Sequence, residues 1–108
     1  MKTVNTNKAP EALGPYSHAT VVNDLVFTSG QIPLNPSTGE LVTEIKAATK
    51  QSLENIKAIL EAAGTSLENV VKTVVYIKNM NDFGDVNEVY GEYFKENAPA
   101  RSCVEVAR

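Results

Sequence analysis

The sequence has a single cysteine, a single histidine and no apolar run near the length of a membrane span. One cysteine excludes an internal disulfide, and no cluster of His, Cys and acidic residues stands at the spacing of metal ligands. A bilayer span takes roughly 20 consecutive apolar residues, and no basic and then apolar leader opens the chain. These absences predict a cytoplasmic protein with no membrane partner and no metal site.

The chain also lacks a large excess of positive or negative charge. The chain has 10 Lys and Arg residues against 13 Asp and Glu residues, which gives a formal net charge of −3. No electrostatic surplus therefore draws it onto phosphate backbones or anionic membranes, which disfavours nucleic acid as a partner. A glycine-rich loop that could cradle a phosphate is missing as well, and we expect no cofactor.

What is present is a short chain with enough apolar residues for one core. Its 108 residues are 43% hydrophobic, which predicts a single domain over residues 1–108. A domain of this size is only modestly stabilised by its own burial, so association with further copies would help it.

Hydrophobic periodicity and turn residues divide the chain into strands and two helices. The 43–63 segment has an apolar stripe at helical spacing, with Thr43 as the expected N-cap and Gly64 as the expected left-handed C′ residue. Asn81 is the expected cap of the second helix, which Pro99 ends. The predicted elements are an edge strand and loop over 1–13, a turn over 14–17, hairpin strands over 18–22 and 25–29, a loop over 33–39, a helix over 43–63, a strand over 70–78, a helix after 81 and a strand over 101–106.

This order of elements predicts an α+β fold in which two helices cover one face of a mixed β-sheet. The other face is then bare and partly lined by valines. A bare face of this kind has to be buried against something, and in so small a chain the simplest partner is a symmetric copy.

The chemistry is expected at Arg101, at the start of the last strand. A strand end after Pro99 is a stiff mount for a guanidinium, whose planar fork of donors matches a carboxylate in two parallel hydrogen bonds. This favours a small carboxylate ligand. The alternative is an arginine that pairs with a structural acid or is simply solvated.

Two further positions stand out before the long helix. The Gly14-Pro15 turn holds Tyr16 out of regular structure, which presents its phenol. Gly30 ends the second hairpin strand, where a glycine often marks close approach of the backbone to a ligand or another chain; an ordinary bulge is the alternative.

The remaining polar candidates have ordinary explanations. Asn87, on the outer surface of the second helix, is usually just solvated. Cys103 is a weak candidate for a nucleophile, because a lone strand cysteine is usually a small hydrophobe. His18 is a poor candidate for its activating base, since it fits equally well as a satisfied strand residue.

Five segments of the chain together resemble the Rid family, most closely the reactive intermediate deaminase A branch of enamine and imine deaminases, also described as the endoribonuclease L-PSP family. The resemblance covers nearly the whole chain in the right order. The segments are Gly14-Pro15-Tyr16, Thr28-Ser29-Gly30-Gln31-Ile32-Pro33, Gln51-Ser52-Leu53-Glu54-Asn55, Met80-Asn81-Asp82-Phe83 and Pro99-Ala100-Arg101-Ser102-Cys103-Val104-Glu105-Val106.

The resemblance implies a chorismate-mutase-like subunit, a homotrimer with a central β-barrel and sites between subunits. It implies a 2-iminobutanoate/2-iminopropanoate deaminase, a cofactor-free hydrolase that converts enamines such as 2-aminoacrylate, in their imine forms, to 2-keto acids and ammonia. Arg101 would clamp the substrate carboxylate. The residues expected to line the pocket or complete it across the interface are Tyr16, Ser29, Gly30, Asn87 and Cys103.

Family members usually continue past the residue that matches Arg108 into a further strand with a glutamate associated with the catalytic water. We therefore expect this domain to be short of that strand, and Glu105 is not that glutamate. Two other functions stay open at this point. One is a protein that binds or senses a 2-keto acid without turning it over, and the other is a ribonuclease or translation inhibitor, against which the negative charge weighs.

Overall fold

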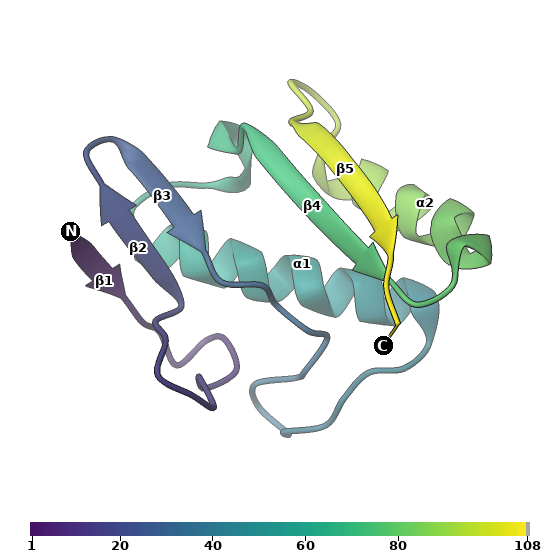
Figure 1. Ribbon diagram of the computed structural model, residues 1–108, viewed down its shortest axis with the longest axis horizontal. Coiled ribbons are helices and arrows are strands. Elements are labelled where there is room, and N and C mark those ends of the chain that lie inside the picture. The colour runs from purple at the N-terminus through teal and green to yellow at the C-terminus, as the bar shows by residue number, and fades with distance from the viewer. Residues whose placement is uncertain (108) are drawn as a thin grey trace.

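The computed structural model describes residues 1–107 and has the predicted α+β order (Figure 1). Two short 3₁₀ helices, at Leu67–Asn69 and Met80–Asp82, were not expected. The elements are β1 (Lys2–Val4), β2 (Ala19–Val22), β3 (Leu25–Thr28), α1 (Ile45–Ala62), η1 (Leu67–Asn69), β4 (Lys72–Ile77), η2 (Met80–Asp82), α2 (Phe83–Tyr93) and β5 (Ala100–Glu105).

The first three strands form an antiparallel sheet in the order β1-β2-β3, which we call the N-terminal sheet. Val22 pairs with Leu25, so the hairpin between β2 and β3 has a two-residue turn, as predicted. Asn23 adopts a positive φ of 54°, which asparagine tolerates better than most residues and which the tight turn requires.

The last two strands form a parallel pair, β4-β5, which we call the C-terminal sheet. A parallel pair needs a crossover, and α2 provides it between β4 and β5. The strands are thus divided between two hydrogen-bonded sheets, whereas the sequence predicted a single mixed sheet. Within residues 1–107, β3 and β4 each pair on one side only, so their outer edges have no strand partner.

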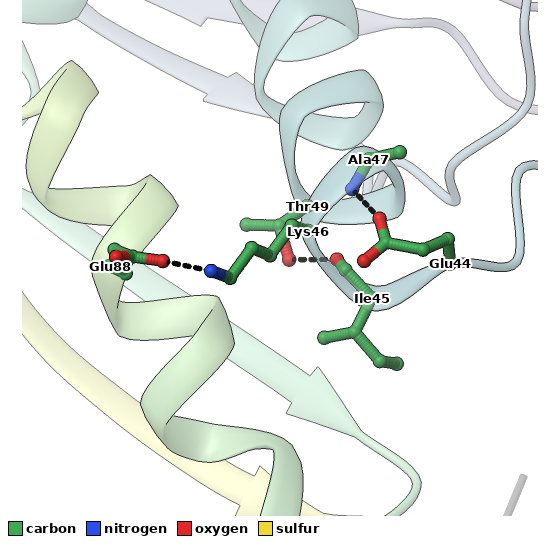
Figure 2. Close-up of polar contacts among 6 residues, drawn as sticks. All are labelled: Glu44, Ile45, Lys46, Ala47, Thr49 and Glu88. Carbon is green, nitrogen blue, oxygen red and sulfur yellow. Dashed lines mark hydrogen bonds and ion pairs between the residues drawn. The ribbon is translucent and has the colours of Figure 1, made fainter.

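Helix α1 lies along both sheets and connects the two halves of the fold (Figure 1). Near its C-terminus, Ile59 is fully buried in a core cluster with Val4, Ala9 and Ala19 of the N-terminal half. Near its N-terminus, Lys46 forms an ion pair with Glu88 of α2, with 2.5 Å between Nζ and Oε2 (Figure 2).

The helix ends differ in part from the prediction. Glu44, not Thr43, is the N-cap of α1, because its carboxylate accepts a hydrogen bond from the Ala47 amide at 2.6 Å (Figure 2). Gly64 follows the helix with a φ of +87°, which confirms the predicted left-handed residue. The predicted cap Asn81 is also wrong: Asn79 caps the 3₁₀ turn that precedes α2, since its side chain accepts from the Asn81 amide.

The face of the sheets away from the helices is exposed and partly apolar. On β4, side chains alternate between half-buried and exposed along the strand, with Tyr76 66% exposed. The apolar side chains that remain exposed on the strands are Val22, Leu25, Phe27, Val74, Tyr76 and Val104. This matches the expectation of one covered and one bare face.

Candidate functional site

Arg101 lies at the start of β5, where it is paired with Thr73 of the neighbouring strand β4. Its Nη1 donates a hydrogen bond of 2.7 Å to Oδ1 of Asn87 on α2. The guanidinium carbon also lies 4.6 Å from the ring centroid of Tyr90 and 5.3 Å from that of Phe83. The guanidinium is thus held by one amide and two aromatic rings.

The local sequence explains this arrangement. Tyr90 faces the C-terminal sheet because it belongs to the apolar stripe of α2, and it is buried. Its hydroxyl forms a 2.7 Å hydrogen bond with Oγ1 of Thr73, the strand partner of Arg101. Asn87 lies three residues before Tyr90, which places its amide on the neighbouring surface of α2. Asn87 is exposed, and its side chain also accepts the hydrogen bond from Arg101, which the solvated role usual for such an asparagine does not include.

The electrostatics of Arg101 favour an anionic ligand. Its hydrogen-bond partner, Asn87, is a neutral amide, and the described residues include no carboxylate paired with this guanidinium. Arg101 therefore differs from an arginine that pairs with a structural acid. In the described chain, the Arg101 guanidinium donates a side-chain hydrogen bond only from Nη1. The other N–H groups of its planar fork can therefore bind a carboxylate.

Cys103 follows Arg101 by two residues and shares its side of β5. Its thiol is free and the residue is half-buried. Glu105, two residues further on, accepts a hydrogen bond of 2.8 Å from the Met80 amide at the start of η2. Glu105 thus binds the first amide of η2, and the expectation that it is not the family's catalytic glutamate remains a prediction.

Tyr16, Ser29 and Gly30 form a second group, beside the N-terminal sheet. Ser29 directly follows β3, and its hydroxyl donates to the Ser17 carbonyl at 2.7 Å. Tyr16 is half-exposed, and its amide donates to the Gly14 carbonyl at 2.8 Å. An open depression of about 400 Å³ is lined by residues that include Tyr16, Ser17, Phe27 and Ser29.

Within one chain, the space beside the Cα atom of Gly30 is open. A Cβ atom built on it would meet nothing within 4 Å, and its φ does not lie in the left-handed region. Neither a positive φ nor a close contact inside the chain therefore calls for glycine here. The expectation that Gly30 approaches a ligand or another chain remains a prediction.

The structure brings the candidate residues together as two groups, and no hydrogen bond within residues 1–107 joins them. Arg101 and Asn87 are in direct contact, with Cys103 on the same strand. Tyr16 and Ser29 share the depression. The first group lies at the C-terminal sheet and the second beside the N-terminal sheet, so the two groups are separate within one chain.

Two buried polar residues belong to this architecture, and only Asn55 was missed by the sequence analysis. Asn55 of α1 is 1% exposed, and its amide nitrogen donates to the carbonyls of Ile32 and Leu34, in the loop after Gly30. His18 is 3% exposed and fully hydrogen-bonded. A polar residue four positions before an apolar one of the helix stripe, as Asn55 stands before Ile59, is a signal that could have identified the first.

Among residues 1–107, no three His, Cys, Asp or Glu side chains are grouped so that they could hold a metal ion. The helices described there are too short or too polar to cross a membrane.

The chain is similar to proteins of known sequence and structure along its whole length. A RutC family protein of Pyrococcus abyssi is 56% identical over 108 residues, covering 99% of this chain and 85% of the relative. A protein of Escherichia coli K12 named 2-iminobutanoate/2-iminopropanoate deaminase is 52% identical over 110 residues, covering 99% of this chain and 86% of the relative.

Solved structures agree with these sequence matches. The E. coli YjgF gene product has a TM-score of 0.95 at 50% identity and covers 100% of this chain and 86% of its own. E. coli TdcF with bound serine has a TM-score of 0.96 at 45% identity, with coverage of 100% and 87%. The profile of the endoribonuclease L-PSP family matches residues 6–108. The chain therefore belongs to the endoribonuclease L-PSP family.

Proposed function

We propose that this protein hydrolyses short 2-imino acids, the imine forms of enamines such as 2-aminoacrylate, to 2-keto acids and ammonia. The observation that carries the proposal is the guanidinium of Arg101, positioned by Asn87 and Tyr90 without a carboxylate partner in the described chain. The names of relatives about half identical to this chain, including the E. coli deaminase, support the same activity.

In this reaction the protein binds and orients the substrate. The fork of Arg101 donates two hydrogen bonds to the carboxylate, which fixes the plane of the adjacent imine carbon. Water adds to that carbon, the imine nitrogen takes up a proton, and the tetrahedral adduct loses ammonia to leave the keto acid. Tyr16, Ser29, Gly30 and Cys103 line the remainder of the site, and their hydroxyl, thiol and backbone groups stabilise the adduct.

The site is completed between subunits of a homotrimer. Within one chain, Arg101 with Asn87 and Tyr16 with Ser29 form two separate groups. The exposed apolar side chains of the bare sheet face, among them Phe27 and Tyr76, supply a surface for association. Light scattering on the purified chain is expected to give the mass of a trimer, and a monodisperse monomer at micromolar concentration would contradict it.

We further propose that one more strand completes the single domain. The outer edges of β3 and β4 are unpaired in the described chain, and the Val106 amide donates to the Ile77 carbonyl beyond β5, at the end of β4. A strand that pairs with such edges satisfies their backbone groups. Appending a C-terminal strand of the family type should raise the melting temperature and the turnover, and if neither changes this assignment is wrong.

The activity is tested by ammonia release from freshly generated 2-aminoacrylate, measured against its spontaneous hydrolysis. The proposal expects release to rise in proportion to protein concentration. A protein that binds 2-keto acids but leaves the rate of ammonia release at the spontaneous level would be a binding protein and not a deaminase.

A single cysteine in the chain is consistent with a place in the cytoplasm, where thiols stay reduced.

A further inference from the structure

His18 is a buried residue whose polar groups are all hydrogen-bonded. It directly precedes β2, its ring bonds to Thr6 and Pro10, and the residue is 3% exposed. Nδ1 accepts from the Thr6 amide at 3.1 Å, and Nε2 lies 2.7 Å from the Pro10 carbonyl. The backbone amide of His18 donates to Oδ1 of Asn5 at 3.1 Å.

These contacts define the protonation state of the ring. A backbone amide only donates, so Nδ1 has to present its lone pair to Thr6. A carbonyl only accepts, so Nε2 has to carry the proton toward Pro10. The ring is therefore neutral and in the Nε2-H tautomer. Both ring nitrogens are occupied, so His18 is unsuited to serve as a general base or as the activator of Cys103.

The backbone of His18 leads directly to the candidate site. Its carbonyl accepts from the Ser29 amide at 2.9 Å, and the neighbouring Ser17 carbonyl accepts from the Ser29 hydroxyl at 2.7 Å. Tyr16 is the next residue toward the N-terminus. Ser29 is thus bonded twice to a backbone segment that the His18 ring holds against residues 5–10.

We infer that His18 is a positioning residue, which in its Nε2-H form fixes the backbone of residues 16–18 and through it the placement of Ser29 and Tyr16. This role rests on the proposed deaminase function for its catalytic consequence. It acts at a distance, because the ring contacts Thr6 and Pro10 and not the open depression.

The first part of the test is spectroscopic and does not depend on activity. Because the chain has one histidine, the ¹⁵N spectrum of its imidazole shows a single ring. The expected pattern is that of the Nε2-H tautomer. A ring that is charged or protonated at Nδ1 under native conditions would overturn the inference.

The second part compares amide exchange in variants. His18→Leu removes both ring contacts, and it should raise the exchange rate of the Ser29 amide on the order of tenfold relative to amides of β4. His18→Gln retains a side-chain amide that can donate to Pro10, and it should restore most of the protection. Ile59→Val trims the core cluster that includes Ala19, the residue after His18, without a polar change; it is the control and should not single out Ser29.

The third part is kinetic. With the carboxylate still held by Arg101, His18→Leu should lower kcat on the order of tenfold and leave KM near that of the parent, and His18→Gln should recover most of kcat. A loss that Ile59→Val reproduces would show a merely structural role and overturn the inference. If His18→Leu does not fold, His18→Asn, whose short amide cannot reach Pro10, takes its place.

The two proposals fail in different ways. A parent protein that releases no ammonia above the spontaneous rate would refute the deaminase function, while the tautomer and the exchange of the Ser29 amide would still decide whether His18 positions this segment. Normal Ser29 exchange in an active His18→Leu variant would refute the role of His18 and leave the deaminase function standing.

Discussion

The two groups of candidate residues are held in place by different kinds of contact. Ser29, in the N-terminal group, is bonded to backbone carbonyls of residues 17 and 18 beside the buried His18 ring. Arg101, in the C-terminal group, is held by an exposed side-chain amide and by aromatic faces. Changes in the buried network should cost stability, whereas changes around Arg101 should cost activity and leave the fold intact.

Arg101→Lys tests this comparison most severely. A lysine keeps the charge but has no planar fork, so it loses a charge-assisted hydrogen bond and the orientation of the carboxylate. We expect a loss of about 2 to 4 kcal/mol in transition-state stabilisation, or roughly thirty- to a thousandfold in kcat/KM for 2-aminoacrylate. The melting temperature should stay near that of the parent.

The control for Arg101→Lys is Lys95→Gln, which removes a cation from the exposed segment after α2. It should leave kcat/KM unchanged, since it lies outside both groups. Deamination by Arg101→Lys at the parent rate would mean that Arg101 is not a bidentate clamp. A large fall in melting temperature would break the comparison, because Arg101 would then be part of what stabilises the fold.

Asn87→Ala should have a smaller effect of the same kind. It removes the amide that orients the guanidinium at 2.7 Å but leaves the guanidinium and both rings. One hydrogen bond is worth about 0.5 to 1.5 kcal/mol, which corresponds to about a two- to twelvefold loss in kcat/KM. Glu92→Gln on the same helix is the matched control. An equal loss in both variants would assign the effect to α2 in general and not to Asn87.

Tyr93→Phe addresses how the C-terminal half is attached to α1. Burial raises the pKa of the Tyr93 phenol well above its ordinary value of 10.0, and its 2.7 Å hydrogen bond to Glu54 raises this pKa further. The folded state therefore favours the protonated phenol, and the stability that this contributes is complete below pH 10.0 and is lost as the pH rises above it.

Denaturant titrations between pH 8 and about 11 measure this contribution. The parent should lose stability more steeply above pH 10.0 than Tyr93→Phe, and the curves should run parallel below it. Curves that stay parallel over the whole range would show that the phenol titrates alike in the folded and unfolded chain.

Lys46→Gln should have the smallest effect. The hydrogen bond and the charge of Glu88 raise the pKa of Lys46, but the side chains of Lys46 and Glu88 are 48% and 60% exposed. Solvent and salt screen such a pair, so the melting temperature should change little, and any difference from the parent should vanish at high salt. A large loss of stability at high salt would mean that Lys46 contributes through packing of its stem.

Local sequence patterns predicted most of the fold. The features that these patterns missed depend on tertiary contacts. The hairpin at Asn23 and the stop at Gly64 follow from backbone preferences, which a sequence displays directly. The cap of α1 was misplaced by one residue because Thr43 and Glu44 both carry oxygen acceptors, and only the geometry decides which one reaches the Ala47 amide.

The candidate site was predictable to a different degree in its two groups. Arg101 could be singled out from its position after Pro99, and the structure agrees that no acid pairs with it in the described chain. The contact with Asn87 could not be derived from periodicity, because it depends on the register of β5 against β4 and on the crossing of α2. His18 was ambiguous for a related reason: its partners, Thr6 and Pro10, lie in a loop without a periodic pattern.

The different connections of the two sheets imply an order of assembly during synthesis. The β2-β3 hairpin needs only a two-residue turn, so it can form as soon as residues 19–28 leave the ribosome. Its apolar cover arrives later, since Ile59 of α1 has to follow. β4 has to wait still longer for β5, because the parallel pair closes only after the whole α2 crossover is made. Arg101 therefore enters the structure after β4 and after the rings of Phe83 and Tyr90, against which it packs.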